Sequence, residues 1–129
     1  MAHDIIQPEG WAKAKGYANG VRAGNQLFIG GQIGWTAEQK FEAQDFLGQC
    51  EQALRNIVAV LEAAGGGPEH LTRLTWYIVD KREYLAKQRE MGEVYRRVLG
   101  RNFPAMAMVV VAGLIEDEAL VEIEATAVL

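Results

Sequence analysis

Cysteine and histidine are scarce in this chain of 129 residues, which has one cysteine, Cys50, and two histidines. A single cysteine cannot form an internal disulfide, so a reducing cytoplasm is the simplest compartment to expect. His3 and His70 have no third ligand at metal-site spacing, which argues against a zinc centre. No pattern typical of a serine hydrolase or a phosphate-binding P-loop occurs either. We therefore expect a protein that uses no metal and no other cofactor.

Long apolar runs and an excess of basic residues are also missing. No stretch approaches the roughly 18 to 20 apolar residues that cross a membrane, and residues 1–8 lack the basic and apolar segments of a signal peptide. The 13 basic residues are outnumbered by 17 acidic ones, which gives a net charge of −4. An acidic chain gains no affinity for phosphate backbones by releasing counterions, so neither nucleic acid nor a membrane is an expected partner.

The composition that remains is that of an ordinary globular protein. Half of the residues are hydrophobic and 23% are charged. The length is close to the commonest domain size, and we treat residues 1–129 as one domain.

The first half of the chain changes from strand-like to helix-like periodicity. Residues 17–22 and 26–30 predict two short strands around a turn at Gly24-Asn25, while residues 1–15 look irregular and are anchored by Trp11. The glycines that follow in residues 30–34 predict a bulge or a close backbone approach. From about residue 42 to Leu61, apolar residues recur every three or four positions and predict an amphipathic helix.

The second half adds a strand, a helix and two more strands. Residues 71–79 alternate as a strand does. Asp80 begins a second helix, with Glu83 in the position of a capping-box partner, and Gly100 ends it. Two further strands start near Ala105 and Val121. This order predicts an α/β protein, a two-layer sandwich of a mixed six-stranded sheet with two helices on one face.

The second face of this sheet needs a cover. In the strand that begins at Ala105, one face carries small and β-branched apolar residues and the other carries Met106 and Met108. Two helices can cover only one face, and a monomer would leave a large apolar patch exposed. We therefore expect oligomerisation through the open face. The alternative is that the irregular N-terminal segment folds over it.

The last strand places a carboxylate in an apolar setting. Val121 and Ile123 suit the helix side, whereas Glu122 and Glu124 project from the opposite face. A carboxylate there is unfavourable unless it is paired or hydrogen-bonded, so Glu122 is a candidate functional residue. A structural carboxylate that accepts backbone amides is the alternative.

Several short motifs occur in a fixed order along the chain. They are Gly16-Tyr17-Ala18, Val21-Arg22-Ala23-Gly24-Asn25, Gly31-Gln32-Ile33, residues 52–57, Glu93-Val94-Tyr95 and Val121-Glu122-Ile123-Glu124-Ala125. Together they resemble the RidA/YjgF family of small enamine/imine deaminases, which also carries an older endoribonuclease L-PSP label. The resemblance covers nearly the whole chain from Gly16 onward. It implies a chorismate-mutase-like fold that assembles as a homotrimer with clefts between subunits.

The resemblance also assigns roles to three residues. Glu122 matches the family glutamate that positions the attacking water, and Tyr17 matches the tyrosine of the site. Gly31 matches the glycine whose backbone lines the cleft. For Tyr17, simple packing at an interface is the alternative.

At three other positions the family pattern is not kept. Met106 stands where the family has the arginine that grips a substrate carboxylate, Met108 where many relatives have a cysteine, and Gly92 where an asparagine is common. Both methionines are most simply packing residues. Arg101, in the preceding loop, and Lys15 are candidate replacement cations. Without the arginine, an apolar cleft should raise the pKa of Glu122 toward neutrality.

The function that follows is hydrolysis of a small enamine, imine or related C–N substrate in the intersubunit clefts. A 2-iminoacid is disfavoured, because a charge-assisted bond to its carboxylate contributes roughly 1.5–3 kcal/mol and has been lost. The alternative is a non-catalytic trimer of the same fold that binds a small metabolite. A ribonuclease is a more distant third possibility.

Overall fold

A six-stranded mixed sheet forms one layer of the molecule. The computed structural model describes residues 1–129. The order of the strands across the sheet is β1-β2-β3-β6-β4-β5, and only the β4–β5 pair is parallel. The strands are β1 (Asp4–Ile6), β2 (Gly20–Ala23), β3 (Gln26–Ile33), β4 (Leu71–Ile78), β5 (Ala105–Val110) and β6 (Val121–Val128).

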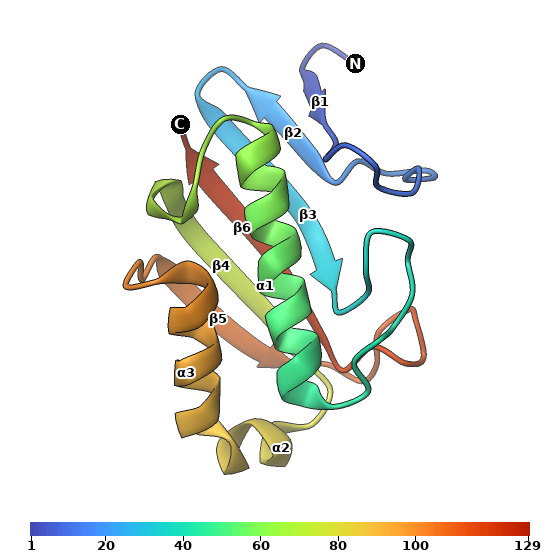
Figure 1. Ribbon diagram of the computed structural model, residues 1–129, viewed down its shortest axis with the longest axis vertical. Helices are drawn as coiled ribbons and strands as arrows, with labels where there is room; N and C mark the ends of the chain where they lie inside the picture. Colours follow the sequence, from blue (N-terminus) through green and yellow to red (C-terminus); the bar gives the residue numbers. More distant parts are fainter.

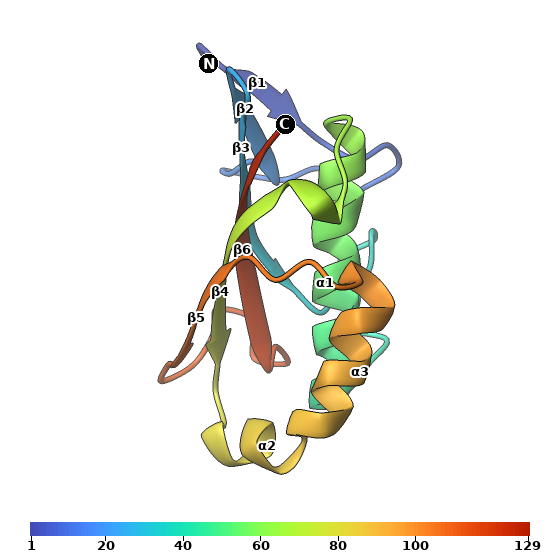
Figure 2. The ribbon, with the colours of Figure 1, turned by 90° about the vertical axis from the view of Figure 1, so that its left-hand side faces the viewer.

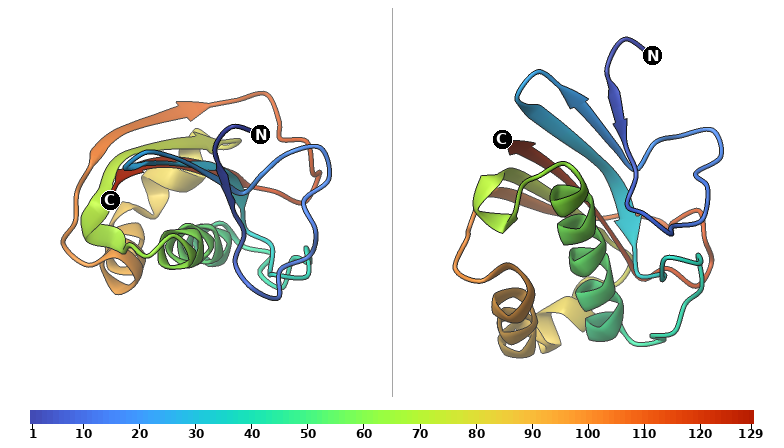
Figure 3. Two further views of the ribbon diagram at one scale, coloured as in Figure 1. Left: turned by 90° about the horizontal axis from the view of Figure 1, so that it is seen from above. Right: turned by 45° about the horizontal axis from the view of Figure 1, so that its top comes forward.

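Three α-helices form the other layer, all on the same face of the sheet (Figures 1 and 2). They are α1 (Phe46–Ala63), α2 (Lys81–Ala86) and α3 (Gln88–Leu99), with a short 3-10 helix, η1 (Pro68–His70), before β4. The end-on view in Figure 3 shows the same two layers. The predicted two-layer α/β sandwich with a mixed six-stranded sheet is therefore confirmed. None of the helices combines the length and the apolar character needed to cross a membrane.

The helix boundaries correct two details of the prediction. The first helix begins later than residue 42, because the Asp45 carboxylate caps it by accepting a hydrogen bond from the Gly48 amide at 3.1 Å. The second helix is two helices, separated at Lys87 (φ −124°, ψ 22°). Asp80 caps α2 as expected, accepting from the amides of Arg82 and Glu83. The apolar stripe continues across Lys87, which is why the periodicity did not reveal the break.

The core lies between α1, α3 and the sheet. It is a cluster of 22 buried residues, in which Leu54 and Ile57 of α1 pack with Leu74 of β4 and Ile123 of β6. Cys50 is fully buried in this cluster, and burial raises the pKa of its thiol. A buried thiol that stays protonated is unreactive, in line with a structural role.

The N-terminal segment is not the cover of the open face. Residues 4–6 form β1, which pairs with β2 in antiparallel register (Ile5 opposite Val21) and extends the edge of the sheet. Trp11 packs against the core cluster, as expected of an anchor. The prediction of an irregular segment was wrong because three residues are too few to show a period of two.

The face of the sheet opposite the helices is bare in the single chain (Figure 2). Phe28 of β3 is 45% exposed there and Val109 of β5 is 43% exposed. Oligomerisation through this face stays a prediction.

Candidate functional site

Strands β3 and β6 bring Gly31 and Glu122 into contact on the open face. The pairing register of β3 and β6 shifts between Ile29 and Gln32, so a bulge falls at Gly30-Gly31. A Cβ atom at Gly31 would lie 2.1 Å from Oε2 of Glu122, which means that only glycine leaves room for the carboxylate as it stands. The glycines thus mark both the bulge and the close approach that the sequence predicted.

A cavity of about 400 Å³ surrounds this carboxylate. We call it the Glu122 pocket. It brings together Tyr17, Gly31 and Glu122, three of the residues that the sequence singled out. The sequence assigned no site role to the other members, which are Asn19, Gln32, Ile33, Trp35, Ile115 and Glu116. Ile115 is 97% exposed, and a lone large apolar residue in an acidic loop is a signal that could have drawn attention to it.

Tyr17 lies on the N-terminal segment, which a chain of amide groups holds in place. Gln32 donates from Nε2 to Oδ1 of Asn19 at 3.1 Å, and Asn19 donates from Nδ2 to Oε1 of Gln7 at 2.9 Å. Asn19 and Gln32 are both buried. Near the rim, Nε2 of Gln39 donates to the Tyr17 hydroxyl at 3.4 Å. The buried amides therefore fix the path of the chain on either side of Tyr17.

Two buried polar residues of α1 hold the loops around the Glu122 pocket. Asn56 donates from Nδ2 to the carbonyl oxygens of Ile33 (3.2 Å) and Trp35 (2.8 Å). Gln49 donates from Nε2 to the Glu118 carbonyl at 2.9 Å, and its Oε1 accepts from the Leu120 amide at 2.8 Å. One helix thus positions both the end of β3 and the loop before β6.

Replacing Gln49 with leucine is expected to lower the free energy of unfolding by about 2–4 kcal/mol, because the carbonyl of Glu118 and the amide of Leu120 lose their buried partner. Urea denaturation would measure the change. Gln44→Leu, just before the same helix, is the control, since the exposed Gln44 bonds only the carbonyl of Phe41, and its effect should stay below about 1 kcal/mol. Equal effects of the two variants would contradict this account of the loop.

The environment of Glu122 raises its pKa above the usual value of 4.5. Burial is the larger cause, and the charge of Glu124 on the same strand is the second. Glu124 itself accepts a hydrogen bond from the hydroxyl of Tyr77 at 2.6 Å. The direction agrees with the expectation from the sequence, and the causes that the structure gives are burial and a neighbouring carboxylate.

We expect an NMR titration of the Glu122 side chain to give a midpoint above 4.5. A carboxylate whose pKa is higher in the folded than in the unfolded state contributes stability at low pH, and that contribution is lost as the pH rises through the folded pKa. The contribution of Glu122 to stability should therefore fall as the pH rises above about 4.5, and comparison with Glu122→Gln should isolate this contribution. A midpoint at or below the usual glutamate value would contradict the expectation.

Met106, Met108 and Gly92, where the family pattern is not kept, lie on the helix side of the sheet, whereas Glu122 lies on the open face. Met106 pairs with Leu74 across the β4–β5 ladder, and Leu74 is buried beneath the helices. Directly paired residues share a face, so Met106 points to the helix side. Glu122 pairs with Tyr77 and points to the open face. Within one chain, Met106 and Glu122 therefore do not share a site.

A second cavity of about 390 Å³ runs between β5 and α3, and we call it the methionine groove. It contains Met106, Met108 and Gly92, so these three predicted residues lie together. Its full lining is Trp76, Tyr84, Gln88, Met91, Gly92, Tyr95, Phe103, Met106, Ala107 and Met108.

The candidate replacement cations lie outside both cavities. Arg101 and Lys15 are exposed, and neither lines the Glu122 pocket or the methionine groove. Arg96, which no sequence motif singled out, lies over Gly92 on α3: a Cβ at Gly92 would be 3.3 Å from its Nη1. No side chain that lines the groove carries a charge.

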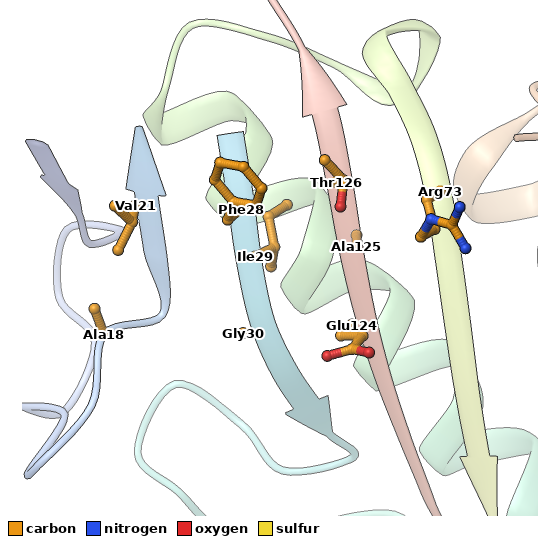
Figure 4. A pocket seen from close by; sticks show the side chains of 9 residues that line it. All are labelled: Ala18, Val21, Phe28, Ile29, Gly30, Arg73, Glu124, Ala125 and Thr126. Carbon is orange, nitrogen blue, oxygen red and sulfur yellow. The ribbon is translucent and has the colours of Figure 1, made fainter. Parts of the chain in front are cut away.

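A third hollow, of about 380 Å³, lies on the open face across β2, β3, β6 and β4 (Figure 4). Figure 4 shows Phe28, Thr126 and Glu124 on adjacent strands, with Arg73 on β4. This hollow combines exposed apolar and charged groups in the middle of the face that lacks a cover.

Comparison with known proteins gives consistent matches. The family model described as endoribonuclease L-PSP matches residues 9–129. A RutC family protein of Pyrococcus horikoshii is 36% identical over 126 residues, which cover 96% of each chain. A 2-iminobutanoate/2-iminopropanoate deaminase of Salmonella typhimurium is 32% identical over 112 residues, covering 87% of this chain and 86% of that protein. The crystal structure of RidA from a Psychrobacter species has a TM-score of 0.83 at 31% identity and covers 98% of this chain and 99% of its own. The range matched by the family model, residues 9–129, includes every residue that lines the Glu122 pocket and the methionine groove.

Proposed function

Because the chain belongs to the endoribonuclease L-PSP family, the RidA/YjgF family of the motif resemblance, we propose that it hydrolyses a small imine, enamine or related C–N compound. Some members of this family are imine deaminases. The observation that carries the proposal is the Glu122 carboxylate, which lies against Gly31 in a cavity where burial raises its pKa.

The proposed catalytic unit is a homotrimer. In one chain the Glu122 pocket and the methionine groove open on opposite faces of the sheet. A second copy that packs on the open face would bring its methionine groove toward the Glu122 pocket of the first. The same packing would cover Phe28 and Val109, whose exposure is unfavourable in a monomer. Sedimentation equilibrium tests the assembly, and a monomer at micromolar concentration would contradict it.

The proposed reaction requires no cofactor. Water adds to the imine carbon, and the Glu122 carboxylate accepts a proton from that water. Glu122 passes this proton to the imine nitrogen, which gives a carbinolamine. A second transfer moves the hydroxyl proton of the carbinolamine through Glu122 to the nitrogen, so that the C–N bond breaks as the C=O bond forms and the products are a carbonyl compound and ammonia. A carboxyl group with a raised pKa is suited to both transfers, because its proton affinity lies closer to neutral pH. Tyr17 and the backbone at Gly31 hold the substrate.

Ammonia release from freshly generated imines tests the proposal. We expect the wild type to accelerate release and the Glu122→Gln variant to lose at least about a hundredfold in kcat, since general acid–base catalysis contributes 10²–10⁴-fold. Glutamine keeps the size of the side chain and cannot accept the proton. Turnover that survives the substitution unchanged would refute the role of Glu122.

The rival function is a trimer that binds a small metabolite without turning it over. The observation that favours it is Met106, which replaces the residue that grips substrate in the family. Thermal stabilisation by a ligand, with no ammonia release from any imine tested, would support this alternative. RNA cleavage that persists through further purification and is lost in Glu122→Gln would instead support the ribonuclease activity in the family's older name.

A further inference from the structure

The methionine groove points to a ligand of a particular chemical class. We infer that it binds an uncharged, ring-sized group that carries one hydrogen-bond-accepting oxygen, as an aromatic amide does. This inference rests on the proposed function, because it assigns a ligand class to one wall of the proposed cleft. The volume of the groove, about 390 Å³, is within the range of small-molecule sites.

The walls of the groove are aromatic and flexible. Tyr95 and Phe103 are stacked, with ring centroids 5.4 Å apart and planes at 6° to each other. The hydroxyl of Tyr95 donates to the carbonyl of Asn102, which fixes this ring at the end of α3. Met91, Met106 and Met108 supply thioether side chains that adapt to the shape of a ring and interact favourably with it. A planar apolar ligand is therefore complementary to this lining.

A buried donor with no partner lies in the same lining. Trp76 is 3% exposed, and its indole Nε1–H makes no hydrogen bond in the structure. Buried polar groups without a partner are uncommon, and each needs an explanation. A ligand oxygen that reaches Nε1 would satisfy it. Since Nε1 is buried, a side chain has to move aside first, and the flexible Met108, which pairs with Trp76 across the β4–β5 ladder, is the candidate. A single buried donor selects an acceptor oxygen rather than a second donor.

The charge of the groove selects against an anion. None of its ten lining residues carries a charge at neutral pH, and its tyrosine hydroxyls are the only acidic groups among them. Burial raises the pKa of Tyr95 to about 12, so this hydroxyl stays neutral. A carboxylate that entered would give up its hydration without gaining a cation. Arg96, over Gly92, is exposed, so solvent screens its charge.

Benzamide and benzoate form a matched pair of probes, since they have the same shape and differ in charge. We would titrate ¹⁵N-labelled full-length protein with each at pH 7 and follow the indole N–H resonance of Trp76. Benzamide is expected to shift this resonance and to bind at least about tenfold more tightly than benzoate, because an unpaired buried charge is strongly disfavoured. Trp76→Phe should weaken benzamide by about three- to tenfold through loss of one hydrogen bond. Trp11→Phe, which removes a tryptophan outside the groove, should leave the affinity unchanged.

Three results would overturn the inference. Benzoate that binds as tightly as benzamide would show that a cation such as Arg96 serves the groove. A Trp76 resonance that neither probe shifts would show that the groove takes no such ligand. Unchanged benzamide affinity in Trp76→Phe would remove the indole from the site. The titration needs no turnover, so it fails or succeeds separately from the Glu122→Gln assay of the proposed reaction.

Discussion

The Gly31→Ala variant is expected to turn over at least about a hundredfold more slowly than the wild type, since a displacement of about 1 Å in an active site can lower the rate by that much. The new Cβ would lie 2.1 Å from Oε2, 2.7 Å from Cδ and 2.9 Å from Cγ of Glu122. Contacts this short force the carboxylate to move. Since Gly31 does not have a positive φ, alanine fits its backbone conformation, and the stability of the fold should change little.

Ammonia-release kinetics and thermal unfolding, measured side by side, test this prediction. Gly113→Ala is the matched control: a Cβ there meets no atom within 4 Å, and φ is not positive. It should leave both rate and stability unchanged. The pKa of Glu122, measured by NMR titration, should also change in Gly31→Ala, because the carboxylate leaves its present surroundings. Full activity in Gly31→Ala would show that the contact between Gly31 and Glu122 has no part in the reaction.

The layer architecture could be predicted from the sequence because its long elements have clear periods. The alternation in residues 71–79 and the three- and four-residue spacing up to Leu61 each extend over enough residues to be recognised. Short elements do not offer this signal. Strand β1 has three residues and exists through its pairing with β2, and the break at Lys87 leaves the apolar stripe of α2 and α3 continuous.

Part of the candidate site could be predicted for a different reason. The motif resemblance pointed to Tyr17, Gly31 and Glu122, and the fold places them in one pocket. Trp35 and Ile115 join that pocket only because Asn56 and Gln49 hold the loops that carry them. Such side-chain-to-backbone bonds between distant segments leave no pattern in the sequence.

The separation of Met106 from Glu122 shows the same limit. Alternation within each strand correctly gave two faces, but which face of β5 matches which face of β6 depends on the register of both with β4. A one-residue slip would exchange the faces. The register is decided by the packing of Leu74 and Trp76 against the helices, which is a tertiary contact. Any effect of Met106 on Glu122 would therefore have to pass between subunits of the proposed trimer.

Met106→Arg provides the sharpest test of that arrangement. Met106 is 44% exposed at the edge of the groove, so an arginine can extend there without being buried. A bidentate arginine–carboxylate interaction contributes roughly 1.5–3 kcal/mol or more, and about 1.4 kcal/mol corresponds to a factor of ten. The variant is therefore expected to gain about ten- to a hundredfold in kcat/KM for a freshly generated 2-iminoacid.

The substrate dependence of this gain identifies its cause. For an uncharged imine of similar size, Met106→Arg should give no gain, because the new guanidinium has no anion to bind. Met106→Leu, which keeps the volume and adds no charge, should leave the preference of the wild type as it is. A gain confined to the carboxylate substrate and abolished by adding Glu122→Gln would require the two residues to act on one bound molecule. Since one chain holds them on opposite faces of its sheet, that result would in turn require a cleft between two subunits. If Met106→Arg folds and assembles normally yet gains nothing with the 2-iminoacid, the methionine groove is not a wall of the cleft that contains Glu122.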